Sequence, residues 1–195
     1  MVRRVFFSFH YEMDVWRANV VRNSWVTKPD REAAGFIDAS EFEEIKRQGE
    51  KAVKQWIDNQ LEGTSVTVVL IGTETYLRDW VRYEIVKSFD RGNALLGVYI
   101  HNIKNQFEMT YIKGPNPFEY VGVYIDENGN GTYCEWSDNK WIIFSLYREC
   151  GLNFDEKYWT NGLYKFNAKV YDWKNDDGYN NLGDWIGEAA KQAGR

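Results

Sequence analysis

The stretch SVTVVLIG, residues 65–72, constrains the fold of this 195-residue chain more than any other segment. Its apolar residues run on almost without interruption, where a strand with one solvated face would alternate apolar and polar residues. Strands of this continuous kind occur in parallel sheets that have helices on both sides. The segment therefore predicts an α/β protein built around a buried parallel sheet.

The sequence around this segment alternates between strand-like and helix-like runs. The other expected strands are RRVFFSF (3–9), GFID (35–38), ALLGVYI (94–100) and KVYDW (169–173). The expected helices are 13–26, one long helix that opens with a capping box at Ser40 and Glu43 and ends near Gly63, 77–89, and 179–193. Such alternation is typical of right-handed βαβ units. We expect a flavodoxin-like, five-stranded parallel sheet with helices on both faces.

Residues from about 104 to 166 follow a different pattern. The run FEYVGVYIDENGNGTYCEWSDNKWIIF predicts antiparallel hairpins joined by Asn-Gly and Asp-Asn turns. Its DENGNG segment begins like a calcium loop, but Ser137 stands where such a loop needs its twelfth-position glutamate. We therefore expect a hairpin turn there and no metal site. Because the chain has three prolines and no Ser/Gly-rich run, we expect one domain, 1–195, with an insertion at about 104–166.

Composition excludes several classes of function. The formal net charge of −5 argues against a surface for nucleic acid or for an anionic membrane, since both need clustered positive charge. No stretch approaches the length of a membrane span, and the N-terminus lacks the apolar region of a signal peptide, so we expect a cytoplasmic protein. Cys134 and Cys150 lack CxxC spacing and are expected to be unpaired thiols.

The helix expected at 77–89 carries a glutamate on its apolar side. With successive residues about 100° apart, one arc gathers apolar side chains: Leu77, Trp80, Val81, Ile85 and Phe89. Glu84 falls inside this arc, although the other side is polar and is formed by Arg78, Asp79, Arg82, Tyr83 and Lys87. Glu84 could be a structural residue that pairs with an arginine or caps a backbone amide. It could also belong to a functional site, a common reason to bury a carboxylate at a cost of several kcal/mol.

Further candidates stand where the strands are expected to end, because ligands of open parallel sheets bind at the carboxyl ends of the strands. These are Phe9, His10, Tyr11, Glu12 and Asp14 after the first strand, Asp38 after the second, Gly72 and Thr73 after the third, and His101 and Asn102 after the fourth. Trp80 lies four residues before Glu84 and shares its helix face.

Each candidate has a structural interpretation as well as a functional one. Phe9 and Trp80 are either core residues or walls of a pocket. Asp38 either contacts a ligand or caps the following helix alongside Ser40. His10 either meets a phosphate or is a surface imidazole, and His101 is more simply structural.

Taken together, these segments resemble a TIR domain. The opening strand ends in Phe-x-Ser-Phe, and the third strand leads into a Trp-x-x-x-Glu helix. More closely, the chain is similar to the ThsB proteins, the TIR-like proteins of the bacterial Thoeris anti-phage system. The matching segments are RVFFSFHY, VVRNSWVTK, FIDAS, TSVTVVLIG, WVRYEIVKS, KGPNPF and VYDWKNDDGYN. An Arg-Asp-x-x-Pro-Gly loop, which often mediates TIR assembly, does not follow the second strand, so the mode of self-association is left open.

The resemblance implies a function. Enzymatic TIR domains cleave NAD+ between nicotinamide and ribose, and Thoeris members close the product into a cyclic ADP-ribose isomer that activates a companion effector, ThsA. It implies Glu84 as the catalytic residue and a phage protein as the trigger, and it favours a place in the pocket for Phe9 and Trp80. Together with the strand-end positions, it leads us to expect that Phe9, His10, Tyr11, Asp38 and Trp80 bind the substrate. NAD+ would be a substrate and not a cofactor, since no G-x-G-x-x-G follows the first strand. A single carboxylate is chemically reasonable, because nicotinamide leaves as a neutral molecule and needs no general acid.

Two other functions are open at this point. The aromatic, hairpin-rich segment 107–147 could be a recognition surface, in which case the chain would be a non-enzymatic TIR-like adaptor that senses a phage component and recruits a partner. A flavodoxin-like binder of a nucleotide or a flavin is the third interpretation.

Overall fold

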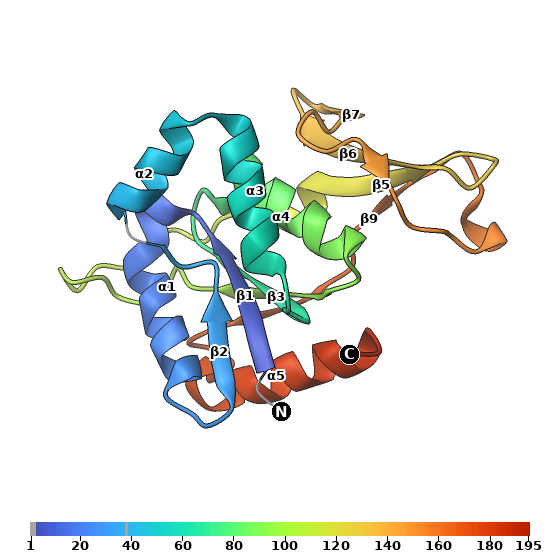
Figure 1. The fold of residues 1–195 in the computed structure, drawn as a ribbon. Helices are drawn as coiled ribbons and strands as arrows, with labels where there is room; N and C mark the ends of the chain where they lie inside the picture. Colours follow the sequence, from blue (N-terminus) through green and yellow to red (C-terminus); the bar gives the residue numbers. More distant parts are fainter. Residues whose placement is uncertain (1–2, 38) are drawn as a thin grey trace.

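The computed structural model describes residues 3–37 and 39–195. Within these residues the strands form one parallel and one antiparallel sheet (Figure 1). The parallel sheet contains β1 (Arg3–Phe9), β2 (Arg31–Ala34), β3 (Val66–Ile71), β4 (Ala94–Tyr99) and β10 (Lys169–Asp172). Its order is β10-β4-β3-β1-β2, so the strand order reverses between β1 and β3. The predicted flavodoxin-like parallel sheet is confirmed.

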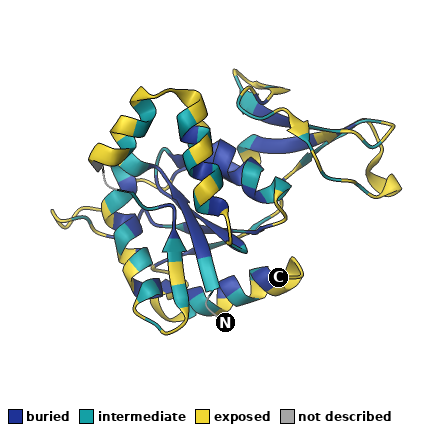
Figure 2. Cartoon of the chain, in the orientation of Figure 1, coloured by how far each residue is buried: buried dark blue, intermediate teal, exposed yellow. Residues whose placement is uncertain are grey.

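Helices cover both faces of this sheet. α1 (Tyr11–Val26) and α5 (Gly178–Gln192) pack on one face, and α3 (Glu50–Leu61) and α4 (Asp79–Asp90) pack on the other. Every residue of β3 is buried, as its unbroken apolar sequence predicts. Figure 2 shows β3 and its neighbour β1 as mostly buried, whereas the edge strand β2 is partly exposed. Among the described residues, no helix has both the length and the apolar character that crossing a bilayer requires.

The second strand lies before its predicted position. Residues 35–37 belong to no strand, and β2 pairs in parallel with β1 from Arg31 opposite Arg3 to Ala34 opposite Phe6. Gly35 ends the strand because its φ of 88° is a left-handed conformation. A Cβ at this position would also lie 2.3 Å from the carbonyl oxygen of Phe7. The prediction of a strand at GFID is therefore wrong.

The long helix predicted from Ser40 is two helices. α2 (Ala39–Arg47) is separated from α3 by Gly49, whose φ is 96°. Apolar spacing continues through this break, which is why the pattern alone indicates a single helix. α2 begins at Ala39, so Ser40 stands in its first turn. Gly63, with φ 73°, follows the end of α3 as expected.

The antiparallel sheet confirms the predicted hairpins. It contains β5 (Val121–Ile125), β6 (Gly131–Ser137), β7 (Lys140–Ile143), β8 (Glu149–Cys150) and β9 (Gly162–Lys165). Asp138 and Asn139 both have positive φ in the tight turn between β6 and β7, as a two-residue hairpin requires. The side chain of Asp126 accepts hydrogen bonds from backbone N–H groups in the turn between β5 and β6. Both cysteines are free, as predicted.

This second sheet covers the face of α4 that the sequence assigns to solvent. Arg82 is only 6% exposed and Tyr83 only 2%, so their predicted exposure is wrong. Apolar residues of the second sheet, among them Val123 and Tyr133, join the same core cluster as Val86 of α4. Three short 3-10 helices complete the part of the chain that the structure describes: η1 (Thr75–Leu77), η2 (Pro117–Tyr120) and η3 (Glu156–Tyr158). Leu77, predicted in the buried arc, instead ends η1 and is 48% exposed.

Candidate functional site

A cavity of about 290 Å³ opens where β1 ends and α4 begins. It is lined by Phe9, His10, Tyr11, Glu12, Phe42, Lys46, Leu77, Arg78, Asp79, Trp80, Val81 and Glu84. All the predicted site residues except Asp38 are among them, and Asp38 lies outside the described residues. The cavity stands next to the point where the strand order reverses, the usual ligand position in open α/β sheets.

Glu84 is the central ionisable group of this cavity. It is 9% exposed, and the Ser8 hydroxyl donates a hydrogen bond of 2.5 Å to its Oε2. Burial raises the pKa of Glu84 to about 8, although the Ser8 hydrogen bond acts in the opposite direction. The carboxyl group is therefore mostly protonated at neutral pH. The partner is a hydroxyl group and not the arginine or backbone amide of the structural interpretation.

Aromatic side chains form the walls of the cavity. The Phe9 and Tyr11 rings lie 6.0 Å apart between centroids, and the Tyr11 and Phe42 rings lie 5.4 Å apart. Trp80 is half-buried on the same helix as Glu84 and meets Tyr83 edge to face. Walls of this kind can stack on a planar ring and exclude water from it.

Nitrogen-bearing side chains line the same cavity. His10 is 5% exposed, so its interpretation as a surface imidazole is wrong. Burial and the charge of Arg78 lower the pKa of His10, and its Nδ1 has no hydrogen-bond partner among the described residues. Lys46 Nζ lies 3.4 Å from Glu12 and 2.9 Å from Glu43. Arg78 pairs with a neighbouring carboxylate through one terminal nitrogen, while its Nε is buried without a described partner.

The remaining strand-end candidates do not line this cavity. Asp14 is 1% exposed, and burial raises its pKa to about 6. Its carboxylate packs so closely on Gly72 that a Cβ there would lie 2.1 Å from Oδ2. Thr73 donates a hydrogen bond to the carbonyl of Ile112. The buried His101 ring stands edge-on to the Tyr99 ring, in line with its structural interpretation.

Sequence reasoning missed several residues of the site, among them Ser8, Lys46 and Arg78. Ser8 stands in the Phe-x-Ser-Phe motif, and a polar residue inside an apolar strand was the signal that it faces something specific. Phe6 and Ser8 share one face of β1, and Phe6 packs with α4. Lys46 and Arg78 come from α2 and from the loop before α4, and only the tertiary fold brings these two segments together.

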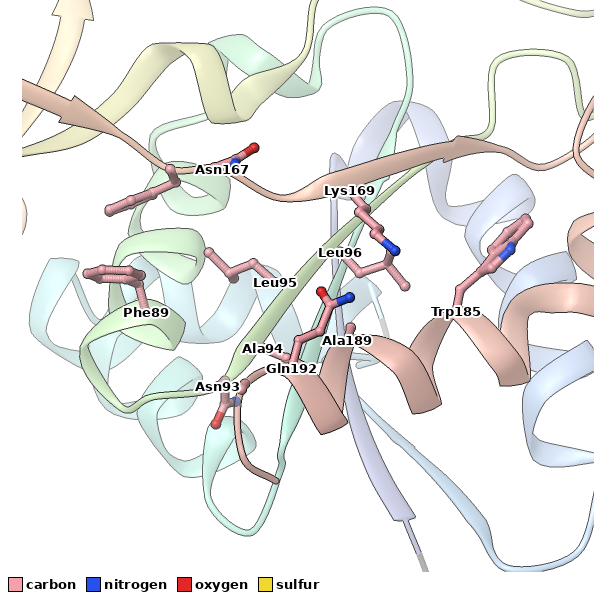
Figure 3. Close-up of a pocket in the computed structure, with 12 residues that line it drawn as sticks. Phe89, Asn93, Ala94, Leu95, Leu96, Asn167, Lys169, Trp185, Ala189 and Gln192 are labelled. Carbon is pink, nitrogen blue, oxygen red and sulfur yellow. The ribbon is translucent and has the colours of Figure 1, made fainter.

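A larger cavity of about 410 Å³ contains none of the predicted site residues. It lies at the opposite end of the strands, between the beginnings of β4 and β10 and the end of α5 (Figure 3). Gln192 and Lys169 point into it from α5 and β10, and Leu95 forms part of its apolar wall. The larger cavity has no buried carboxyl group among its lining residues, whereas the smaller one contains Glu84. We therefore take the smaller cavity as the candidate site.

Two comparisons agree with this geometry. The family described as "Thoeris protein ThsB, TIR-like domain" matches residues 6–105, the part that runs from β1 through β4 and includes Trp80 and Glu84. A protein of Bacillus cereus (strain MSX-D12), named "Putative cyclic ADP-D-ribose synthase ThsB1", is 42% identical over 191 residues. That match covers 95% of this chain and 100% of the relative. With the sheet order, the Trp-x-x-x-Glu helix and both matches in agreement, the chain belongs to the ThsB family of TIR-like Thoeris proteins.

Proposed function

We propose that this chain cleaves NAD+ between nicotinamide and ribose and closes the product into a cyclic ADP-ribose isomer, with Glu84 as the catalytic residue. The observation that carries the proposal is a carboxyl group buried beside Trp80 in an aromatic cavity and held by a serine hydroxyl. The name of the Bacillus cereus relative, a cyclic ADP-D-ribose synthase, supports the same reaction.

The state of Glu84 suits a substrate whose reacting ring is a cation. Its pKa of about 8 leaves the carboxyl group mostly protonated in the free protein at neutral pH. The pyridinium ring of NAD+ is positively charged, and a nearby positive charge favours the ionised form of a carboxyl group. Substrate binding would thus release the Glu84 proton to solvent. The resulting carboxylate would hold the ribose hydroxyls and stabilise the positive charge that develops on the ribose as neutral nicotinamide leaves.

Other residues of the cavity would bind and orient the substrate. Phe9, Tyr11 and Trp80 supply aromatic surfaces that exclude water, which favours ring closure over hydrolysis. His10 is buried and neutral at pH 7, so it would serve as a hydrogen-bonding group. Asp38 stays a predicted substrate contact. The proposal extends to two features that the sequence resemblance implies, activation of a companion effector, ThsA, by the product and a phage protein as the trigger.

Product analysis tests the proposed reaction. The full chain is incubated with NAD+, alone and with extract from phage-infected cells. Nicotinamide and the nucleotide products are then separated by chromatography and identified by mass spectrometry. We expect nicotinamide and a nucleotide that is one water lighter than linear ADP-ribose. Linear ADP-ribose as the sole nucleotide product would contradict cyclisation. The absence of nicotinamide under both conditions would contradict cleavage.

Arg78→Gln should weaken the binding of NAD+ selectively. We infer that Arg78 and Lys46 contact the diphosphate, since they bring the positive charge of the cavity. Loss of one charge-assisted contact should raise KM for NAD+ by about tenfold. Nicotinamide riboside, which has no phosphate, should be cleaved by the variant as by the natural chain. Arg91→Gln, at an exposed arginine after α4, is the matched control. An equal rise in KM for both substrates would show that Arg78 does not bind the diphosphate.

An adaptor is the second candidate function, and one observation favours it. Large apolar side chains are exposed within segment 107–147: Phe107, Met109, Ile112, Tyr124, Ile142 and Ile143. A phage-protection assay separates the two functions, because an adaptor tolerates Glu84→Gln and a cyclase does not.

A further inference from the structure

α4 carries a buried cation on the side opposite the parallel sheet. Arg82 Nη1 donates a hydrogen bond of 2.6 Å to Oε2 of Glu135 in β6. The two side chains are 8% and 10% exposed, so the pair is almost completely removed from water. Arg82 Nε also donates a hydrogen bond of 3.0 Å to the backbone carbonyl of Tyr76 in η1. One guanidinium group therefore connects the antiparallel sheet with η1.

η1 belongs to the wall of the candidate site. Leu77 and Arg78, the two residues after Tyr76, both line the cavity that contains Glu84. The ring of Tyr76 also packs against Tyr120 of η2, with centroids 4.8 Å apart, and η2 leads directly into β5. The segment that borders the cavity is thus attached to the second sheet at a side chain and at a backbone carbonyl.

The chemistry of arginine makes this connection directional. Its planar guanidinium group holds several acceptors in fixed directions, which a lysine ammonium does not. The Glu135 carboxylate keeps the guanidinium in place, and the guanidinium in turn keeps the Tyr76 carbonyl in place. A buried ion pair is weak evidence of stabilisation, because desolvation offsets much of its attraction. A positioning role accounts better for charges placed at this point.

We propose that Arg82 and Glu135 are positioning residues through which the antiparallel sheet sets the affinity of the cavity for its substrate. The inference rests on the proposed function for its kinetic readout. Arg82 and Glu135 would act through Leu77 and Arg78, and neither touches the cavity itself. Glu84 is held by Ser8 on the parallel sheet, so the chemical step should depend less on the second sheet than substrate binding does.

Glu135→Gln removes the charge while it keeps the size of the side chain. We expect KM for NAD+ to rise by about tenfold and kcat to change by less than about threefold. Arg82→Lys keeps the charge but cannot hold Glu135 and the Tyr76 carbonyl in the same fixed directions, so it should share the rise in KM. Glu119→Gln is the matched control, because Glu119 forms an exposed ion pair with Lys165 of the same sheet. It should leave KM unchanged.

Hydrogen exchange measures the positioning without any substrate. The backbone N–H groups of Leu77 and Arg78 donate to the carbonyls of Glu74 and Thr75. In Glu135→Gln and in Arg82→Lys these two amides should exchange faster, and in Glu119→Gln they should exchange as in the natural chain. The exchange rates test the positioning role without any substrate, so they are informative even if NAD+ is not the substrate. A failure of this inference can thus be distinguished from a failure of the proposed function. If Glu135→Gln does not fold, the exchange rates of the same two amides in Arg82→Lys test the positioning role.

Two results would overturn the inference. The first is unchanged exchange at both amides in every variant that folds, with at most a lower melting temperature, since the pair would then be structural only. The second is a fall of kcat at constant KM, which would mean that the pair acts on the chemical step and not on the wall of the cavity.

Discussion

Glu84→Gln should abolish nicotinamide release and at the same time make the folded chain more stable at neutral pH. The glutamine keeps the size of the side chain and can still accept the Ser8 hydrogen bond, but it cannot carry the negative charge that the developing ribose cation requires. We expect the rate to fall by at least about a thousandfold. A steady rate close to that of the natural chain would remove Glu84 from the catalytic role.

The gain in stability follows from the raised pKa of Glu84. Its value is about 8 in the folded chain, and a solvated glutamate has 4.5. Well below pH 4.5 the carboxyl group is protonated in both the folded and the unfolded chain, so it does not change the free energy of unfolding. As the pH rises from 4.5 to about 8, the unfolded chain ionises more readily, and the folded state loses stability relative to it. Glutamine does not titrate, so the variant avoids this loss.

Chemical denaturation at two pH values measures the effect. At pH 7 the free energy of unfolding of Glu84→Gln should exceed that of the natural chain by about 3 kcal/mol, and near pH 4 the difference should vanish. Glu44→Gln, at an exposed glutamate of α2, is the control and should change the free energy by less than about 0.5 kcal/mol at either pH. A variant that is less stable than the natural chain at pH 7 would contradict the buried, protonated carboxyl group.

Asp90→Ala should destabilise the junction between α4 and the antiparallel sheet. The Asp90 carboxylate accepts hydrogen bonds from the hydroxyls of Tyr133 and Tyr147, both 2.9 Å long, and from the backbone N–H of Gly151. Tyr133 is fully buried, and its hydroxyl would lose its carboxylate partner. We expect the free energy of unfolding to fall by about 3 kcal/mol.

The control for Asp90→Ala is Asp126→Ala. Asp126 also accepts several hydrogen bonds, from Asn128 and Asn130, but it does so in an exposed hairpin turn where water can replace it. Its replacement should cost about 1 kcal/mol. Equal losses in the two variants, measured by denaturant titration, would show that the junction is no more important for stability than a surface turn.

The sequence predicts best those elements whose surroundings are simple. β3 is apolar throughout and buried throughout, so its pattern and its environment agree. The sequence pattern does not reveal β2, because this short strand lies at the edge of the sheet and includes the polar residues Arg31 and Glu32. The strand ends before Gly35, which takes a left-handed conformation. The break at Gly49 escapes notice for a related reason, since the apolar spacing on its two sides is compatible with one helix.

α4 shows why part of the site could not be predicted from the sequence. Helical periodicity places Glu84 on the parallel sheet and Arg82 in solvent, and only the first of these is correct. Periodicity describes one partner surface, whereas α4 has two. Likewise the ends of β1 and β3 point to Phe9 and Glu84, but nothing local indicates that α2 brings Lys46 to the same cavity.

The enclosure of α4 between two sheets has a mechanical consequence. A helix that packs on both sides cannot slide or rotate alone, because any displacement would break contacts with both layers at once. A protein that docked on the hairpins would therefore act, through Arg82, on the cavity wall at Leu77 and Arg78 without entering the cavity.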